Sequence, residues 1–199
     1  MIQIVVARYN EDIEWTKQFE NVLIYNKGNI LEDSVKLPNV GREGHTYYKY
    51  ICDNYDKLAD YIVFLQGYPF DHSPNIINDL QQLNEKEFNI DFKFLSNCIV
   101  ETTFKEQLNK HYQCIGIYET YKRIFGKDCE DEQIIFGCGA QFIVSKKNIL
   151  NRPKSFYESI VKMLEYHIDP FEVYDIERFH KYIFTTCELG INQSNELDL

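Results

Sequence analysis

A short apolar run near the middle of the chain constrains the fold more than any other feature. Residues 61–65 read Tyr-Ile-Val-Phe-Leu, a continuous series of aromatic, β-branched and aliphatic side chains. A run of this kind predicts a strand that is buried on both faces of a mostly parallel sheet. The pattern breaks at Gln66 and Gly67, and Pro69 cannot donate a hydrogen bond to a sheet ladder. We therefore expect the strand to end there and a polar turn to follow it.

Two titratable side chains that could serve in catalysis or binding, Asp71 and His72, come directly after this break. In open α/β sheets, ligands bind in the crevice beyond the carboxyl ends of the strands. Segment 66–72 is therefore our candidate for the floor of a functional site. The alternative is an ordinary polar turn after a core strand, because many buried strands end in this way.

Length and charge narrow the class of protein. A chain of 199 residues favours one domain, which we place at 1–190, followed by a polar tail at 191–199. The net charge of −10 argues against broad electrostatic contact with nucleic acid or an anionic membrane. No apolar run approaches the length of a membrane span, and the first residues do not resemble a signal peptide. We expect a cytoplasmic protein; its oligomeric state is not encoded in any pattern we recognise.

The six cysteines are dispersed, and none forms a Cys-x-x-Cys pair. Several lie beside apolar residues, as Cys98 does in Asn-Cys-Ile-Val. This distribution favours small buried thiols in a reducing compartment over disulfides or a zinc site.

The rest of the chain alternates predicted strands with predicted helices. Apolar runs predict further strands over 2–7, 21–25, 94–100 and a glycine-interrupted block at 134–144. Capping residues and apolar periodicity predict helices over 13–19, 46–55, 74–83, 103–125, 146–150, 155–166 and 174–184. This succession predicts a single α/β domain with a mostly parallel central sheet.

Two basic residues are predicted to face an anion. Arg8 follows the first predicted strand, where it can neutralise a phosphate or pair with Glu11 or Asp12. Segment 39–45 places two glycines and Arg42 ahead of a helix, whose free N–H groups and dipole can hold an anion. The segment matches neither a P-loop nor a dinucleotide fingerprint, and a flexible start of the helix is the competing explanation.

Five parts of the chain resemble one protein family. They are 5–12, 39–47, 63–67, 139–145 with Arg152-Pro153 and Phe156-Tyr157 behind it, and 176–184. In this order they resemble the domain-of-unknown-function family numbered 3431. That family is similar in plan to the A-type nucleotide-sugar glycosyltransferases, which have one α/β domain. In those enzymes the first strand ends at the nucleotide and the central strand ends at the diphosphate.

The resemblance implies transfer of a sugar from a nucleotide-sugar donor to a saccharide or another hydroxyl acceptor. It implies substrate contacts by Arg8, Tyr9, Asn10, Glu11, Arg42, Gln66, Gly67, His72, Gln141 and His180. A-type enzymes usually carry an Asp-x-Asp pair after the central strand, which holds a divalent metal such as Mn²⁺ or Mg²⁺. Here segment 66–72 contains one carboxylate, so Asp71 is the candidate metal or ribose ligand. Without the pair, Arg8 and Arg42 are the candidates to stabilise the diphosphate.

Inverting transfer also needs a carboxylate that deprotonates the acceptor hydroxyl. Glu177 is our first candidate for this base and Asp175 the second, both in the last predicted helix. The competing explanation for Glu177 is a carboxylate favoured by the helix dipole or paired with Arg178 or Lys181.

Two other functions remain open from the sequence. One is a metal-assisted hydrolase in which Asp71, His72 and Glu177 activate water, although their spacing matches no known ligand pattern. The other is a non-catalytic domain that binds a sugar or nucleotide, because 15 tyrosines suit carbohydrate stacking as well as core packing.

Overall fold

Eight strands and seven α-helices form the part of the chain that the structure describes. The computed structural model describes residues 1–85, 89–110, 114–130 and 133–185, so the predicted tail at 191–199 lies outside the described residues. The strands are β1 (Ile2–Arg8), β2 (Val22–Asn26), β3 (Val35–Lys36), β4 (Tyr61–Gln66), β5 (Phe92–Phe94), β6 (Ile99–Thr103), β7 (Gln133–Gly137) and β8 (Phe142–Ser145). The helices are α1 (Arg42–Asn54), α2 (Ile76–Glu85), α3 (Phe104–Lys110), α4 (Ile117–Phe125), α5 (Lys146–Leu150), α6 (Lys154–Leu164) and α7 (Phe171–Thr185). Two short 3-10 helices, η1 (Glu14–Gln18) and η2 (Tyr55–Lys57), precede β2 and β4.

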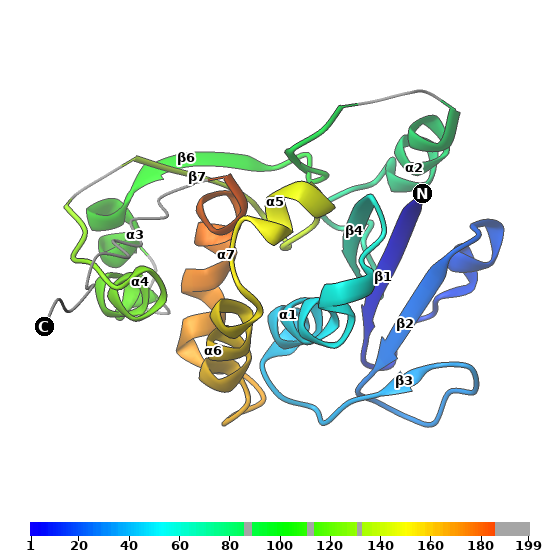
Figure 1. Ribbon diagram of the computed structural model, residues 1–199, viewed down its shortest axis with the longest axis horizontal. Helices are drawn as coiled ribbons and strands as arrows, with labels where there is room; N and C mark the ends of the chain where they lie inside the picture. Colours follow the sequence, from blue (N-terminus) through cyan, green and yellow to red (C-terminus); the bar gives the residue numbers. More distant parts are fainter. Residues whose placement is uncertain (86–88, 111–113, 131–132, 186–199) are drawn as a thin grey trace, which may run out of the picture.

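The central sheet has six strands in the order β3-β2-β1-β4-β8-β5. Figure 1 shows the run from β3 through β2 and β1 to β4. The first four are mutually parallel, whereas β8 runs antiparallel to both of its neighbours. The prediction of an α/β fold with a mostly parallel sheet is therefore confirmed. The buried run at 61–65 lies in β4, as expected for a strand with neighbours on both sides.

The chain changes direction across the sheet between β1 and β4. From β1 it moves outward to β2 and β3, and it then returns through α1 to β4 on the other side of β1. The carboxyl ends of β1 and β4 therefore lie side by side at a topological switch point. In sheets of this type a crevice forms at such a point.

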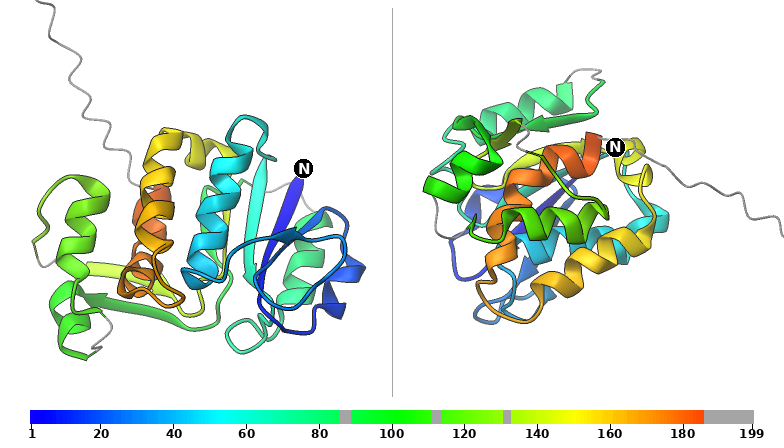
Figure 2. Two further views of the ribbon diagram at one scale, coloured as in Figure 1. Left: turned by 90° about the horizontal axis from the view of Figure 1, so that it is seen from below. Right: turned by 90° about the vertical axis from the view of Figure 1, so that its left-hand side faces the viewer.

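Side chains of β4 alternate between two hydrophobic cores. Ile62 and Phe64 pack in a core with residues of α1, α6 and α7. Val63 and Leu65 pack in a second core with Trp15 and residues of α2. Figure 2 shows α1, α6 and α7 gathered on one side of the sheet and α2 on the other. The alternation is the two-residue period of a strand, and here both faces are apolar because both are covered.

The predicted strand at 134–144 is wrong as one element. It forms β7, which pairs with β6 in a separate two-stranded sheet, and β8, which enters the central sheet. The turn between them needs positive φ at Gly139 (82°) and Ala140 (54°), a conformation that ends a strand. The predicted strand at 94–100 divides in the same way between β5 and β6.

Several helix predictions also needed correction. The predicted helix at 103–125 is interrupted, because α4 starts only after Gly116, and residues 111–113 lie outside the described part. The segment at 13–19 forms only the short η1, and α7 starts at Phe171 rather than at 174. In the described parts of the chain, no helix is both long enough and apolar enough to cross a membrane.

Candidate functional site

A cavity of about 650 Å³ lies at the switch point, beyond the carboxyl ends of β1 and β4. Its walls come from these strand ends, from the loop after β2, from the start of α1 and from the loop before α7. The lining residues are Ala7, Arg8, Tyr9, Glu11, Lys27, Asn39, Arg42, Glu43, Gln66, Tyr68, Asp71 and Ile168. We call this cavity the switch-point pocket.

Arg8 is held in the pocket wall by neutral oxygen atoms. Its Nε donates to the backbone oxygen of Glu11 at 3.0 Å, and its Nη1 donates to Asn26 Oδ1 at 2.8 Å and to the Tyr9 carbonyl at 3.1 Å. The expected alternative of an ion pair with Glu11 or Asp12 is not found. Within the described chain no carboxylate oxygen lies within 4.0 Å of the guanidinium nitrogens, so the charge of Arg8 is not neutralised by a partner.

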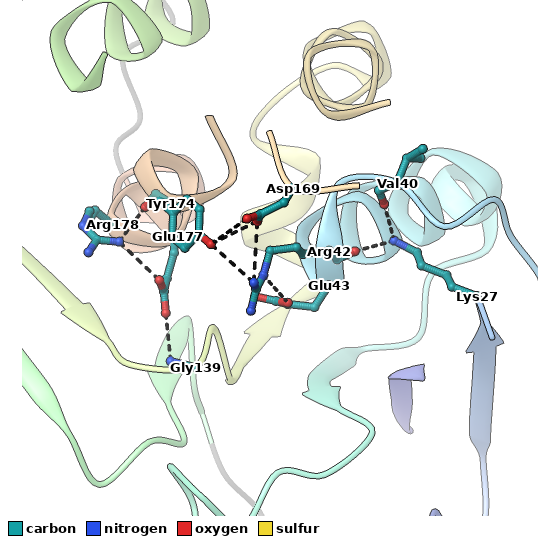
Figure 3. A network of polar contacts seen from close by, with 9 residues as sticks. All are labelled: Lys27, Val40, Arg42, Glu43, Gly139, Asp169, Tyr174, Glu177 and Arg178. Atoms are coloured by element: carbon teal, nitrogen blue, oxygen red, sulfur yellow. Dashed lines mark hydrogen bonds and ion pairs between the residues drawn. The ribbon is translucent and has the colours of Figure 1, made fainter. Parts of the chain in front are cut away.

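Lys27 is a second cation of the pocket, and Glu43 of the pocket wall acts on its charge from beyond ion-pair distance. Its Nζ donates to the Val40 carbonyl at 2.6 Å and to the Arg42 carbonyl, just where α1 begins (Figure 3). No carboxylate of the described residues lies within 4.0 Å of Nζ. Burial lowers the pKa of Lys27 to about 8, so the ammonium form still predominates at neutral pH.

Arg42 has a strained backbone and a partly neutralised side chain. Its φ is +45°, and Gly41 before it has φ +59°, where a Cβ would lie 2.7 Å from the Leu164 carbonyl. The Arg42 guanidinium lies 3.5 Å from Asp169 Oδ1 and is stacked over the Tyr174 ring, with 5.5 Å to the centroid (Figure 3). Arg42 therefore lines the pocket while sharing its charge with α7 and the loop before it.

The carboxylates of the pocket differ in how firmly they are held. Glu11 Oε2 accepts a hydrogen bond of 2.6 Å from the Tyr9 amide and lies so close to Gly67 that a Cβ there would meet it at 2.7 Å. Glu43 lies 3.7 Å from Arg42. Asp71 is exposed and has no hydrogen bond or ion pair with any described residue. Asp71 is thus the pocket carboxylate most open to a ligand.

Two aromatic rings complete the pocket. The side chains of Tyr9 and Tyr68 are about half exposed, at 49% and 50%. Gln66, the last residue of β4, is paired with Ala7 of β1 and also lines the cavity. Asn10 does not line it: its Oδ1 accepts a hydrogen bond of 2.8 Å from the Asn29 amide and ties two loops together. The pocket therefore offers ring faces, amide groups and charges of both signs.

Glu177 anchors the turn between β7 and β8. Its Oε1 accepts a hydrogen bond of 2.8 Å from the Gly139 amide, and its Oε2 lies 3.2 Å from Arg178 Nη1 (Figure 3). Burial raises the pKa of Glu177, and Glu43 nearby raises it further. The side chain is 18% exposed. Glu177 thus lies close to Glu43 of the pocket wall but is not itself one of the lining residues.

Asp175 and His180 point into the protein interior rather than the pocket. Asp175 is fully buried and accepts a hydrogen bond of 2.6 Å from Thr120 Oγ1, and burial raises its pKa to about 7. His180 is also buried, with its ring centroid 4.6 Å from that of Phe142, and burial lowers its pKa to about 3. Neither residue is among those that line the switch-point pocket.

Gln141 and His72 support the pocket from outside. Gln141 is fully buried, and its Nε2 donates to the Pro69 carbonyl at 3.0 Å, behind the loop that carries Asp71. The His72 ring lies against Gly139, at a place where any Cβ would collide with it. These two residues position the loop after β4 and do not line the cavity.

A family model with the description protein of unknown function (DUF3431) matches residues 4–190. The chain belongs to this family. No curated protein and no solved structure matches it significantly. The family that the sequence motifs resembled is therefore confirmed, whereas the similarity in plan to A-type glycosyltransferases stays a prediction, because the family description names no activity.

Several pocket residues of this DUF3431 protein were not predicted individually, although Asn39, Glu43 and Tyr68 lie in the predicted segments 39–45 and 66–72. Lys27, Asn39, Glu43, Tyr68 and Ile168 all line the cavity. A usable signal existed for Lys27, because it follows a predicted strand, and the ends of neighbouring parallel strands meet at one edge of a sheet. Ile168 comes from the loop before α7, and only the tertiary structure places it there.

The described residues of this DUF3431 protein form no ready-made metal centre. Within 1–85, 89–110, 114–130 and 133–185, no three His, Cys, Asp or Glu side chains are grouped closely enough to hold a metal ion. Asp71, His72 and Glu177 in particular do not converge. Among the carboxylates of the pocket, Asp71 is the one that no described residue binds, so it is the candidate ligand there.

Proposed function

We propose that the chain is a glycosyltransferase whose nucleotide-sugar donor binds in the switch-point pocket. The observation that carries this proposal is the presence at the switch point of two cations, Arg8 and Lys27, that form no ion pair with any carboxylate of the described residues. A nucleoside diphosphate is a leaving group whose developing negative charge must be stabilised by positive charge. The two cations supply such charge where the ends of β1 and β2 meet.

The remaining pocket chemistry suits the rest of a nucleotide sugar. A volume of about 650 Å³ falls within the range of small-molecule sites. The half-exposed rings of Tyr9 and Tyr68 offer flat surfaces for a base or a sugar ring. Glu11 and Gln66 supply hydrogen-bonding groups for ribose or sugar hydroxyls. These features support a donor with both charged and ring-shaped parts.

The resemblance to A-type enzymes implies a divalent metal. The pocket could hold such an ion through Asp71 together with the donor. Mg²⁺ is commonly held by one or two carboxylates together with substrate phosphates rather than by a cage of protein ligands. Asp71 is open to such an arrangement because no described residue binds it. A metal held there with the donor phosphates would supply further positive charge to the leaving group.

For the acceptor step we propose Glu177 as the general base. Its raised pKa suits a carboxylate that must accept a proton, and Glu43, whose charge contributes to that rise, lines the pocket. The competing role is structural, because both carboxylate oxygens already have partners in Gly139 and Arg178. The substitution Glu177→Gln, which replaces the carboxylate by an amide of the same shape, distinguishes the catalytic role from the structural one.

The metal-assisted hydrolase is the weaker alternative, because its three proposed residues do not converge on one point. A non-catalytic nucleotide-binding domain is the stronger alternative, since exposed tyrosines and unpaired cations also suit binding alone. Turnover decides between this alternative and the transferase.

The deciding experiment is calorimetry with nucleoside diphosphates and the matching nucleosides, followed by an assay for donor consumption. We expect uridine or guanosine diphosphate to bind at least about tenfold more tightly than its nucleoside, because only the diphosphate meets Arg8 and Lys27. Equal binding of both would refute the donor site. Tight binding without turnover, across a panel of nucleotide sugars and saccharide acceptors, would favour the binding domain.

A further inference from the structure

Two cysteines far apart in the sequence lie next to each other. Cys98 precedes β6 and Cys138 follows β7, and their sulfur atoms are 2.7 Å apart. The Cys138 amide also donates to the Cys98 carbonyl at 2.9 Å, so the backbones are joined beside the thiols. Cys98 is exposed and Cys138 is partly buried, whereas the sequence indicated isolated, buried thiols. A covalent S–S bond of about 2.05 Å needs only a small further approach.

We propose that Cys98 and Cys138 form a reversible disulfide, a redox-modification site at the base of the loop that carries Asp71. The proposal is independent of the function proposed above, because it rests on the cysteine pair and its neighbours alone. In a reducing compartment the pair is a dithiol, and an oxidising shift closes it.

The oxidant we name is a small-molecule disulfide such as oxidised glutathione. The thiolate of the exposed Cys98 attacks one sulfur of this disulfide and releases one thiolate, which leaves a mixed disulfide on Cys98. The thiolate of Cys138 then attacks the Cys98 sulfur and releases the second thiolate. The two protons lost by the cysteines protonate the two leaving thiolates, and the two cysteines are oxidised while the external disulfide is reduced.

The exposure of the two thiols fixes the order of these steps. Cys98 is open to solvent and can meet an external disulfide. Burial and the hydrogen bond with Cys98 raise the pKa of Cys138 to about 12, which makes Cys138 a poor first nucleophile. In the second, intramolecular step, the proximity of Cys138 to the Cys98 sulfur compensates for the low fraction of Cys138 thiolate.

The chain neighbours of both cysteines hold His72. Asn97, next to Cys98, donates its amide to the His72 carbonyl at 2.8 Å. Gly139, next to Cys138, lies against the His72 ring. His72 follows Asp71, which lines the switch-point pocket. A bond between the cysteines therefore ties together the two segments that hold this loop, and it restricts the loop's motion.

The test is to equilibrate the native protein with reduced and oxidised glutathione at several ratios and to map peptides by mass spectrometry. We expect a peptide pair linked through Cys98 and Cys138 to be the main product, with full reversal by excess reduced glutathione. We also expect amide hydrogen exchange at residues 70–73 to slow in the oxidised protein. These readouts need neither a ligand nor an activity.

Serine variants provide the controls. Cys98→Ser and Cys138→Ser should each abolish the link and the slowing of exchange, whereas Cys129→Ser should leave both intact. A stable glutathione adduct on Cys98 without the link would overturn the proposal, as would a link between other cysteines. Unchanged exchange at 70–73 in the linked protein would overturn the coupling to the pocket loop. Serine is close in size to cysteine, so a retained melting temperature shows that each variant is folded.

Discussion

The Glu177 carboxylate accepts a hydrogen bond of 2.8 Å from the Gly139 amide, and this contact joins α7 to the turn between the two sheets. The contact allows a clean test of the proposed base. In Glu177→Gln the side-chain oxygen can still accept from Gly139, but the group cannot accept a proton. We expect unchanged donor affinity and a loss of transfer of about a hundredfold or more, measured by steady-state kinetics.

The matched control for this variant is Glu172→Gln on the same helix. The substitution Glu172→Gln also removes an ion pair, the one between Glu172 and Arg123. Glu172 does not line the pocket. We expect this control to transfer at a near-normal rate. Near-normal turnover in Glu177→Gln itself, with only a lower melting temperature, would show that Glu177 positions the turn and takes no part in chemistry.

The cation prediction concerns Lys27. In Lys27→Met the alkyl stem is largely kept and the charge is removed. We expect the affinity for a nucleoside diphosphate to fall by about tenfold or more, with little change for the nucleoside, because hydrogen bonds to charged groups contribute about 1.5–3 kcal/mol. Lys36→Met is the control, since Lys36 is exposed at the end of β3 and outside the pocket.

Arg42→Ala extends the same comparison. Arg42 already shares its charge with Asp169 and Glu43, so we expect a smaller loss of diphosphate affinity than in Lys27→Met. An equal loss for nucleoside and diphosphate in either variant would instead indicate a damaged fold.

The metal prediction concerns Asp71. If Asp71 can hold a divalent ion together with the donor, manganese should strengthen binding of the nucleoside diphosphate to the native protein. The same addition should strengthen binding much less in Asp71→Asn, because an amide is a weaker ligand for a hard cation. Calorimetry with manganese and with a chelator measures both effects. Equal affinity in the two solutions, together with full activity in chelator, would remove the metal from the mechanism.

The pH prediction concerns Asp175. The pKa of Asp175 is about 7 in the folded protein and near 3.8 in the unfolded chain. At pH values between these two, the folded state therefore binds more protons than the unfolded state. Stability contributed by this residue is therefore highest at acidic pH and falls as pH rises towards 7. Between pH 5 and pH 7 the loss is about 2 kcal/mol of unfolding free energy.

Comparing the native protein with Asp175→Asn separates the effect of Asp175 on stability from that of the buried histidines. The histidines change the stability with pH in the opposite direction. The pKa values of His45 and His180 are lowered to about 4 and about 3, so these residues favour the folded state as pH rises. We expect native protein to lose stability relative to the variant between pH 5 and pH 7, measured by denaturant unfolding. A constant difference between the two proteins over this range would contradict the raised pKa. Asp128→Asn, at an exposed position, serves as the control.

The sequence was most informative where a strand is buried on both faces. The predicted strands at 2–7 and 61–65 each match a strand of the sheet to within one residue, because an apolar run reports burial directly. The block at 134–144 shows the limit of this reasoning. Its apolar character reports burial in two different sheets, and nothing in the residues alone states which partner each half will have.

The candidate site was also predictable in part. Arg8, Glu11, Gln66 and Asp71 line one pocket, because strand ends in a parallel sheet meet at one edge; their predicted contacts with substrate or metal stay predictions. Residues of α7 could not be assigned in this way. That helix is buried on several sides, so its periodicity does not tell which face is near the pocket, and Asp175 and His180 lie in the core.

The position of β8 has a consequence for synthesis on the ribosome. This strand separates β4 from β5, although both of these precede it by many residues in the chain. The nascent chain therefore carries β4 with one unpaired edge until residues 142–145 have left the ribosome. An apolar strand with an open edge can pair with another chain. We expect stalled or truncated chains that end before β8 to aggregate, whereas chains that reach the end of α7 should fold.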